Sequence, residues 1–213
     1  MKALVMLWVL CCVAPLSWAS ERGKLEKIEI DTSFAARARG VDQVMTVCRG
    51  CHSMKYIKYR DLANLGIAAD KITEWRAGQP LSAHITSQMP GEVAAAAFGN
   101  VPPDLSLIVQ ARADGIPYVY SFLLGFYITP AGLPDNHVFP ETKMPDVMGV
   151  SGASAAQRAE IGGRARDIVS FLNWAADPHE EERHRLGYYV IAYLILLTVL
   201  LYLVKRQIWA RLK

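Results

Sequence analysis

The chain has 213 residues, with 23 Lys and Arg against 20 Asp and Glu, and a formal net charge of +3 at pH 7. Five of the basic residues lie near the two ends, so residues 20–187 carry 18 Lys and Arg against all 20 acids, a net charge of −2. This balance excludes the strongly basic surface of a nucleic-acid-binding protein, and it is too small to identify a basic partner.

Residues 1–19 have the pattern of a secretory signal peptide. Lys2 precedes an apolar stretch, and small residues stand at the two positions that a signal peptidase reads before a cut after Ala19. A retained anchor helix fits less well, because the apolar stretch is short. Cleavage would remove Cys11 and Cys12. We therefore expect residues 20–186 to form one exported domain, long enough to bury a core of its own.

The first predicted helix starts with Thr32 or Ser33 as its cap and leads to Cys48. Apolar residues recur along it at intervals of three and four, at Phe34, Ala38, Val41, Val44 or Met45, and Cys48. Gly40 lies within this helix at a cost of about 1 kcal/mol relative to Ala, which a close contact between helices would explain.

Cys48-Arg49-Gly50-Cys51-His52 forms the Cys-x-x-Cys-His pattern of covalent c-type haem attachment. Each thiol can add to one vinyl group of the porphyrin, and the tether holds His52 beneath the iron as the proximal ligand. A small disulfide and half of a zinc site are the alternatives. A zinc site needs a second pair of ligands at similar spacing, and the mature chain offers no other cysteine. We therefore expect one covalent haem c per chain.

Several short helices are expected between the motif and residue 126. The run 53–62 mixes basic and aromatic residues, which we interpret as a haem rim or a solvated face. The helices are one or two within 61–75, one at the end of 77–97, one over 105–113 capped by Asp104, and a buried aromatic one over 118–126.

Residues 129–152 are rich in Pro and Gly and predict one long loop, of a length that usually carries function. Ser154 and Gln157 fit a capping box at the start of the last helix of the domain, and Pro178 ends its pattern. One face of this helix is apolar, at Ile161, Ala165, Ile168, Leu172 and Ala175.

The 18 residues of the stretch 187–204 include no charged side chain. As a helix they span about 27 Å, close to the hydrocarbon thickness of a bilayer. The tail 205–213 has four basic residues and no acid, so the positive-inside rule places it in the cytoplasm. We expect a single-span anchor in the inner membrane with the haem domain on the periplasmic side, the orientation that the signal peptide also predicts.

A low-spin haem that transfers electrons needs a second axial ligand, which Met or His can supply. Spacing favours Met144, in the long loop just before the last helix of the domain. A methionine in a loop is often only a packing residue, so spacing alone does not settle the assignment. Met89, His137 and Met148 remain alternatives.

Four separated stretches carry a more specific pattern. They are the haem motif with its sequel at 47–60, the Pro-Pro-Asp-Leu-Ser segment within 101–112, the aromatic run 118–127, and Phe-Leu-Asn-Trp-Ala-Ala-Asp-Pro at 171–178. Together with the C-terminal anchor they resemble the cytochrome c1 family, the c-type haem subunits of the quinol:cytochrome c oxidoreductase, in their compact bacterial form. The resemblance covers nearly all of residues 33–213.

This resemblance implies a mostly α-helical cytochrome c domain with long loops around one haem, followed by one transmembrane helix. It implies Met144 as the sixth ligand and Arg112 as the partner of a haem propionate, with Tyr118 close by. Pro102 and Pro103 would form a wall at the haem edge. Without the resemblance, Arg112 could be read as a solvated residue at the end of a helix, and Tyr118 as an ordinary core residue.

The resemblance also implies a function in electron transport. The haem would pass one electron from a Rieske iron–sulfur protein to a cytochrome c acceptor, within a dimeric complex that contains cytochrome b. The chain itself offers no nucleophile or general base, so quinol oxidation would belong to cytochrome b. The alternatives are an anchored cytochrome that feeds another terminal oxidase or reductase, and a haem ligand sensor or peroxidase with an open sixth position.

Overall fold

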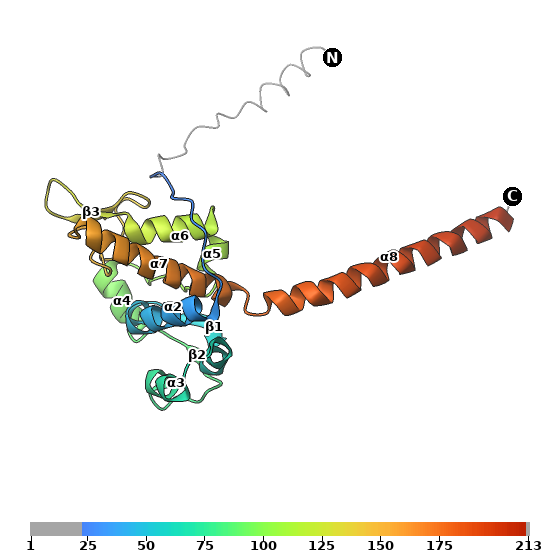
Figure 1. Ribbon diagram of the computed structural model, residues 1–213, viewed down its shortest axis with the longest axis horizontal. Helices are drawn as coiled ribbons and strands as arrows, with labels where there is room; N and C mark the ends of the chain where they lie inside the picture. The colour runs from blue at the N-terminus through green and yellow to red at the C-terminus, as the bar shows by residue number, and fades with distance from the viewer. Residues whose placement is uncertain (1–22, 212–213) are drawn as a thin grey trace, which may run out of the picture.

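A computed structural model describes residues 23–211, so the predicted signal peptide with Cys11 and Cys12 lies outside the described residues. In chain order the elements are α2 (Phe34–Thr46), the 3₁₀ helix η1 (Cys48–Gly50), β1 (Met54–Lys58), the 3₁₀ helix η2 (Tyr59–Leu65), α3 (Ala69–Arg76), β2 (His84–Ile85), α4 (Gly91–Phe98), α5 (Ile108–Ala111), α6 (Gly115–Leu124), β3 (Phe126–Ile128), β4 (Pro134–Asn136), α7 (Ala155–Ala176) and α8 (Glu180–Arg211) (Figure 1). The fold is mostly helical, as the sequence predicts.

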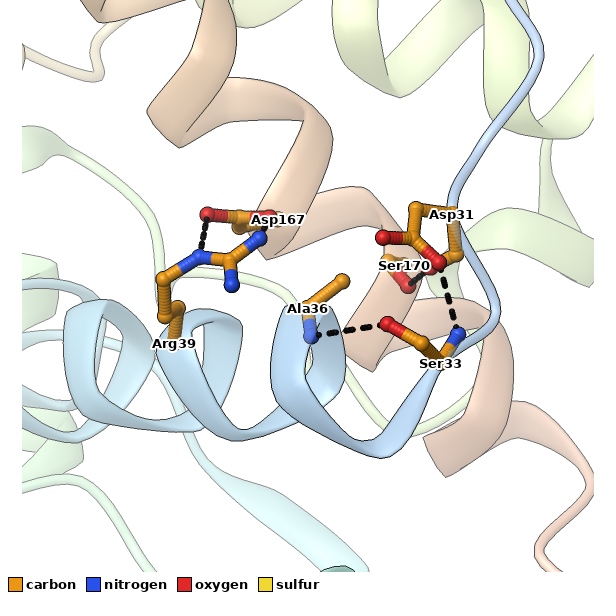
Figure 2. Close-up of polar contacts among 6 residues, drawn as sticks. All are labelled: Asp31, Ser33, Ala36, Arg39, Asp167 and Ser170. Atoms are coloured by element: carbon orange, nitrogen blue, oxygen red, sulfur yellow. Dashed lines mark hydrogen bonds and ion pairs between the residues drawn. The ribbon is translucent and has the colours of Figure 1, made fainter.

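Helices α2 and α7 cross at the centre of the domain, and α7 also packs against α5 and α6. At the crossing, a Cβ on Gly40 would lie 2.0 Å from the carbonyl oxygen of Asp167, so only glycine allows this approach. Arg39 Nε and Nη2 donate to the two carboxylate oxygens of Asp167 at 2.7 and 2.8 Å (Figure 2). The close contact expected at Gly40 is therefore confirmed.

The crossing also determines which face of α2 is buried. The buried residues are Ala36, Gly40, Val41, Val44 and Met45. The predicted stripe was wrong at its start, because the side chain of Phe34 is 65% exposed and Ala38 is only half-buried. The helix turns Gly40 toward α7, since that glycine permits the closest backbone contact, and Phe34 consequently points outward.

Both long helices begin with the predicted caps. The Ser33 hydroxyl accepts a hydrogen bond from the Ala36 amide at 3.2 Å (Figure 2). Ser154 and Gln157 form the capping box of α7. The five predicted apolar positions of α7 are all buried, at Ile161, Ala165, Ile168, Leu172 and Ala175.

The segment before α2 is extended and wraps the domain. The Glu26 amide donates to the hydroxyl of Ser121 on α6 at 2.7 Å. Ser170 on α7 donates to the carbonyl of Asp31, as Figure 2 shows. Ile28 and Ile30 pack against the core from this segment.

Two small antiparallel sheets were not expected from the sequence. β1 pairs with β2 and, with η2 and α3, forms a lobe over residues 54–85, hereafter the β1–α3 lobe, with α3 at the edge of the domain (Figure 1). β3 pairs with β4 inside the region predicted as helix and loop. α6 ends before Gly125, where a Cβ would lie 2.9 Å from Asn136 Oδ1.

The helix expected over 105–113 is shorter, and α5 has only four residues. Asp104 does not cap it. Its carboxylate instead accepts from the amides of Ser106 and Lys55, both at 2.9 Å. These bonds hold the segment that contains Pro102 and Pro103 against the start of β1.

Helix α8 continues past the predicted apolar stretch at both ends and leaves the domain as one long rod (Figure 1). Within residues 23–211 it is the one helix long and apolar enough to cross a membrane, and its side chains are not buried by the rest of the chain. Asp177 precedes α8 and forms an ion pair with Arg183, with Arg183 Nη2 and Asp177 Oδ2 2.5 Å apart.

Candidate haem-binding site

A cavity of about 420 Å³ opens between the motif, the segment before α5, helix α6, helix α7 and the loop before α7. This size falls in the usual range for small-molecule and cofactor sites. It is lined by all eight residues that the sequence analysis singled out: Cys48, Cys51, His52, Pro102, Pro103, Arg112, Tyr118 and Met144. The alternatives for the sixth ligand, Met89, His137 and Met148, are not among the lining residues.

The motif follows α2 directly as the 3₁₀ turn η1. The amides of Cys51 and His52 both donate to the carbonyl of Cys48, at 3.1 and 2.9 Å, so the turn presents these three side chains to one cavity. Both thiols are free. Burial raises the pKa of the Cys48 thiol to about 11, so the sulfur is neutral at pH 7 and suits an apolar wall.

The ring of His52 is fixed from behind by a backbone group. Its Nδ1 lies 2.7 Å from the carbonyl oxygen of Pro103, which can only accept, so Nδ1 carries the proton. Nε2 is then the free, basic nitrogen, as a metal ligand requires. Burial lowers the pKa of His52 despite the opposing effect of this hydrogen bond, and the neutral ligand form is favoured.

The loop that carries Met144 is held by hydrogen bonds from backbone amides to the half-buried side chain of Asp146. The Asp146 carboxylate accepts from the amides of Val150 and Ser151 at 3.0 and 2.7 Å. The Met144 side chain packs against both hydrophobic clusters of the domain. The half-buried thioether is thus held by packing and by a hydrogen-bonded loop.

Asn136 is a further anchor of this loop, and the sequence analysis did not single it out. It is fully buried; its Nδ2 donates to the carbonyl of Phe122 at 2.8 Å, and its Oδ1 accepts from the amides of Val138 and Phe139 at 2.9 and 3.3 Å. An asparagine that completes such a turn leaves no periodic signal in a sequence.

Asn136→Ala is expected to destabilise the holoprotein by about 1–3 kcal/mol, because it leaves buried backbone groups without partners. Urea unfolding in detergent would measure the change, with Asn64→Ala at an exposed position as the control. Equal stability of the two variants would contradict this role of Asn136.

Arg112 and Tyr118 lie together at the cavity. The Arg112 guanidinium is 5.8 Å from the centre of the Tyr118 ring, and Tyr118 stacks on Phe122 with the ring centres 6.4 Å apart. No described residue forms a salt bridge with Arg112. Lys143 adds a second cationic side chain to the lining, and Glu141 adds one carboxylate, so the cations outnumber the acids. Two cations at an apolar cavity suit a ligand with carboxylates at its edge.

Most of the remaining lining is apolar, and it comes from elements distant in sequence. These residues are Val47, Phe98, Leu105, Ile108, Val119, Phe122, Leu123, Phe139, Val147, Ile168 and Leu172. Ile168 and Leu172 belong to the predicted stripe of α7, so its periodicity could have indicated them. Phe139 and Val147 come from the long loop, where no periodicity exists.

These residues fit a haem. The apolar walls suit the porphyrin and the two thiols suit its vinyl groups, and one imidazole and one thioether could bind its iron. No cluster of three His, Cys, Asp or Glu able to hold a bare metal ion occurs in the part of the chain that the structure describes. A zinc site, weighed as an alternative, therefore finds no ligand set among these residues.

A helical domain that brings a Cys-x-x-Cys-His motif and a methionine to one apolar cavity defines a c-type cytochrome. A comparison with protein-family models matches residues 29–92 and 75–212 to the Cytochrome C1 family. The chain belongs to the cytochrome c1 family.

Curated relatives agree over most of the chain. It is 32% identical to cytochrome c1 of Allochromatium vinosum, with 98% of both chains aligned. It is 30% identical to cytochrome c1 of Rhodospirillum rubrum, over 92% of this chain and 86% of the relative. It is also 31% identical to the protein named cytochrome b/c1 of Bradyrhizobium diazoefficiens, over 91% of this chain and 35% of that longer protein.

Membership in the family establishes the general role. The chain is an electron-transfer subunit of a respiratory cytochrome bc1 complex, and it carries a haem cofactor. Covalent haem c is typical of this family, and Cys48 and Cys51 are present for it. Its relatives are membrane-anchored by one C-terminal helix, which corresponds to α8. Cytochrome b and a Rieske protein are implied as partners.

Proposed function

We propose that the chain holds one covalent haem c and passes single electrons from the Rieske iron–sulfur protein to a cytochrome c acceptor. The observation that carries this proposal is the convergence of the motif, Met144 and Arg112 on one apolar cavity. When bound, the haem iron supplies one-electron redox chemistry.

Each residue has a separate part in the proposal. Cys48 and Cys51 would hold the haem through thioether bonds, and Nε2 of His52 and the sulfur of Met144 would bind its iron. The proton on Nδ1 of His52, donated to the carbonyl of Pro103, keeps the ring in its ligand tautomer. A thioether ligand and an apolar lining both raise the reduction potential, because they disfavour the more highly charged oxidised state.

Arg112 pairs with a haem propionate in this proposal, and Tyr118 orders the guanidinium from one side. Pro102 and Pro103 form the wall at the haem edge, held in place by Asp104. The chain has no part in quinol oxidation, which belongs to cytochrome b.

The proposed topology follows the charge and hydropathy of the chain. Residues 1–19 are the signal peptide, 20–186 the periplasmic haem domain, 187–204 the membrane span and 205–213 the cytoplasmic tail. The uncharged stretch 187–204 within α8 supports the span, and the basic tail supports the orientation. The complex is proposed to be a dimer.

Copurification in mild detergent tests the proposed partners. An affinity-tagged chain is expected to retain a cytochrome b and a Rieske protein, and reduced Rieske protein should reduce its haem before a cytochrome c is reduced. Retention of subunits of a terminal oxidase or another reductase in their place would favour the first alternative function.

A further inference from the structure

Arg49 occupies the first of the two unspecified positions of the Cys-x-x-Cys-His motif. Its side chain does not line the cavity and turns instead into the β1–α3 lobe. Its Nη1 donates to the carbonyl of Trp75 at 2.7 Å, and its Nε donates to the carbonyl of Thr86 at 3.1 Å. Its guanidinium lies 5.6 Å from the centre of the Tyr59 ring, which is almost fully buried. One side chain therefore joins two segments of the β1–α3 lobe, and the residue directly after the lobe, to the haem loop (residues 48–52).

The two carbonyl groups that accept from Arg49 have no hydrogen-bond donor within a helix or sheet. The Trp75 carbonyl belongs to the last turn of α3, where backbone carbonyls have no intrahelical donor, and a cation there also complements the helix dipole. Thr86 directly follows β2, where the sheet has ended. A planar guanidinium can reach both carbonyls and stack on a ring at once, whereas the compact ammonium of lysine cannot.

The backbone of the motif is held by the same neighbouring segment. The Gln88 amide donates to the carbonyl of Arg49 at 3.0 Å, and the Met89 amide donates to the carbonyl of Gly50 at 3.1 Å. Residues 86–89 thus bind the haem loop through both backbone and side chain. His52 comes three residues after Arg49, so any movement of this loop moves the proximal ligand.

We propose that Arg49 is a positioning residue that fastens the haem loop to the β1–α3 lobe and thereby helps to set the reduction potential of the haem. Release of this contact loosens the loop and admits water to the side of His52. Water stabilises the more highly charged oxidised iron, so the potential falls. This inference rests on the proposed attachment of haem at Cys48 and Cys51.

The test compares Arg49→Ala and Arg49→Lys in the full-length holoprotein in detergent. Hydrogen exchange at the Gln88 and Met89 amides should become at least about tenfold faster in both variants. The midpoint potential from an optical redox titration should fall in both, although the Lys variant keeps the positive charge. Arg60→Ala is the matched control, because Arg60 is an exposed cation of the same lobe, paired with Asp61 and hydrogen-bonded through its amide to Leu81 rather than to the motif.

The outcomes separate the possibilities. A Lys variant that behaves as wild type would overturn the proposal, and so would an equal drop in potential for Arg60→Ala, which would indicate net charge alone. Faster exchange with an unchanged potential would reduce Arg49 to a structural contact and would also overturn it. A wild-type chain without covalent haem in a denaturing haem stain would instead contradict the proposed function.

Discussion

Met144→Leu is expected to lower the midpoint potential of the holoprotein and to let its reduced form bind carbon monoxide. Leucine keeps the volume of the side chain but removes the sulfur, so the cavity keeps its shape and loses one proposed ligand. We expect the thioether to bind reduced iron at least about ten times more tightly than oxidised iron. For a one-electron couple, losing such a ligand lowers the midpoint potential by about 59 mV or more.

The chain offers two matched controls for this experiment. Met89→Leu and Met148→Leu change the same side chain at positions that do not line the cavity, and both should leave the potential and the carbon monoxide spectrum as in wild type. A response at Met89 or Met148, with none at Met144, would show that the ligand had been assigned to the wrong methionine. A wild-type reduced protein that binds carbon monoxide readily would favour the sensor or peroxidase alternative.

Gly40→Ala should destabilise the holoprotein by about 1–3 kcal/mol or more, because the added methyl group has no space at the crossing of α2 and α7. The methyl carbon would lie 2.0 Å from the Asp167 carbonyl oxygen and 2.8 Å from Cβ of Phe171. Both atoms belong to the backbone of α7 or stand directly on it, so relief requires the two helices to move apart. Urea unfolding followed by tryptophan fluorescence measures the loss.

Gly163→Ala, on α7, is the control, and it is expected to raise the stability of the protein. No atom lies within 4 Å of a Cβ at Gly163, and the position is exposed in the interior of α7. Alanine there should stabilise the protein by about 0.5–1 kcal/mol, because it restricts the unfolded chain more than glycine does. Similar changes in both variants would contradict the steric explanation for Gly40.

Gly40→Ala should also disturb the haem site, since α2 leads directly into the motif. A displaced α2 would carry Cys48 with it, and the haem absorbance should melt together with the tryptophan signal. The opposite result would be a variant that unfolds at a lower urea concentration but keeps the wild-type haem spectrum until it unfolds. That result would contradict the expected effect on the haem site, because it would mean that α2 moves without moving Cys48.

The elements that the sequence predicted well are those with a short-range cause. Ser154 and Gln157 cap α7 through bonds between residues three apart, and the stripe from Ile161 to Ala175 repeats with the helical period. The anchor follows from a run of apolar residues alone. None of these features needs a distant partner, so local spacing is sufficient to identify them.

The predictions that failed are those in which a distant contact decided the outcome. Phe34 shares the helical period with buried residues, but the closeness of Gly40 to Asp167 rotates it outward. Asp104 stands where a helix cap would stand, but the Lys55 amide competes for its carboxylate. The β3–β4 hairpin begins at the last residue of the predicted helix 118–126 and continues into the predicted loop 129–152. The sequence did not indicate it, because Asn136 and Gly125 meet only after the chain has folded.

By itself, the sequence determined the kind of cofactor and the membrane anchor, because thiols and imidazole at fixed spacing and an uncharged apolar run carry their chemistry in the covalent chain. It ranked Met144 first among several candidate ligands but could not place it. Only the tertiary structure brought Met144, Arg112 and the motif to one cavity and left Met89, Met148 and His137 outside it. It alone showed the contacts of Arg49 and Asn136, because hydrogen bonds between segments far apart in the chain depend on packing and have no periodicity in sequence.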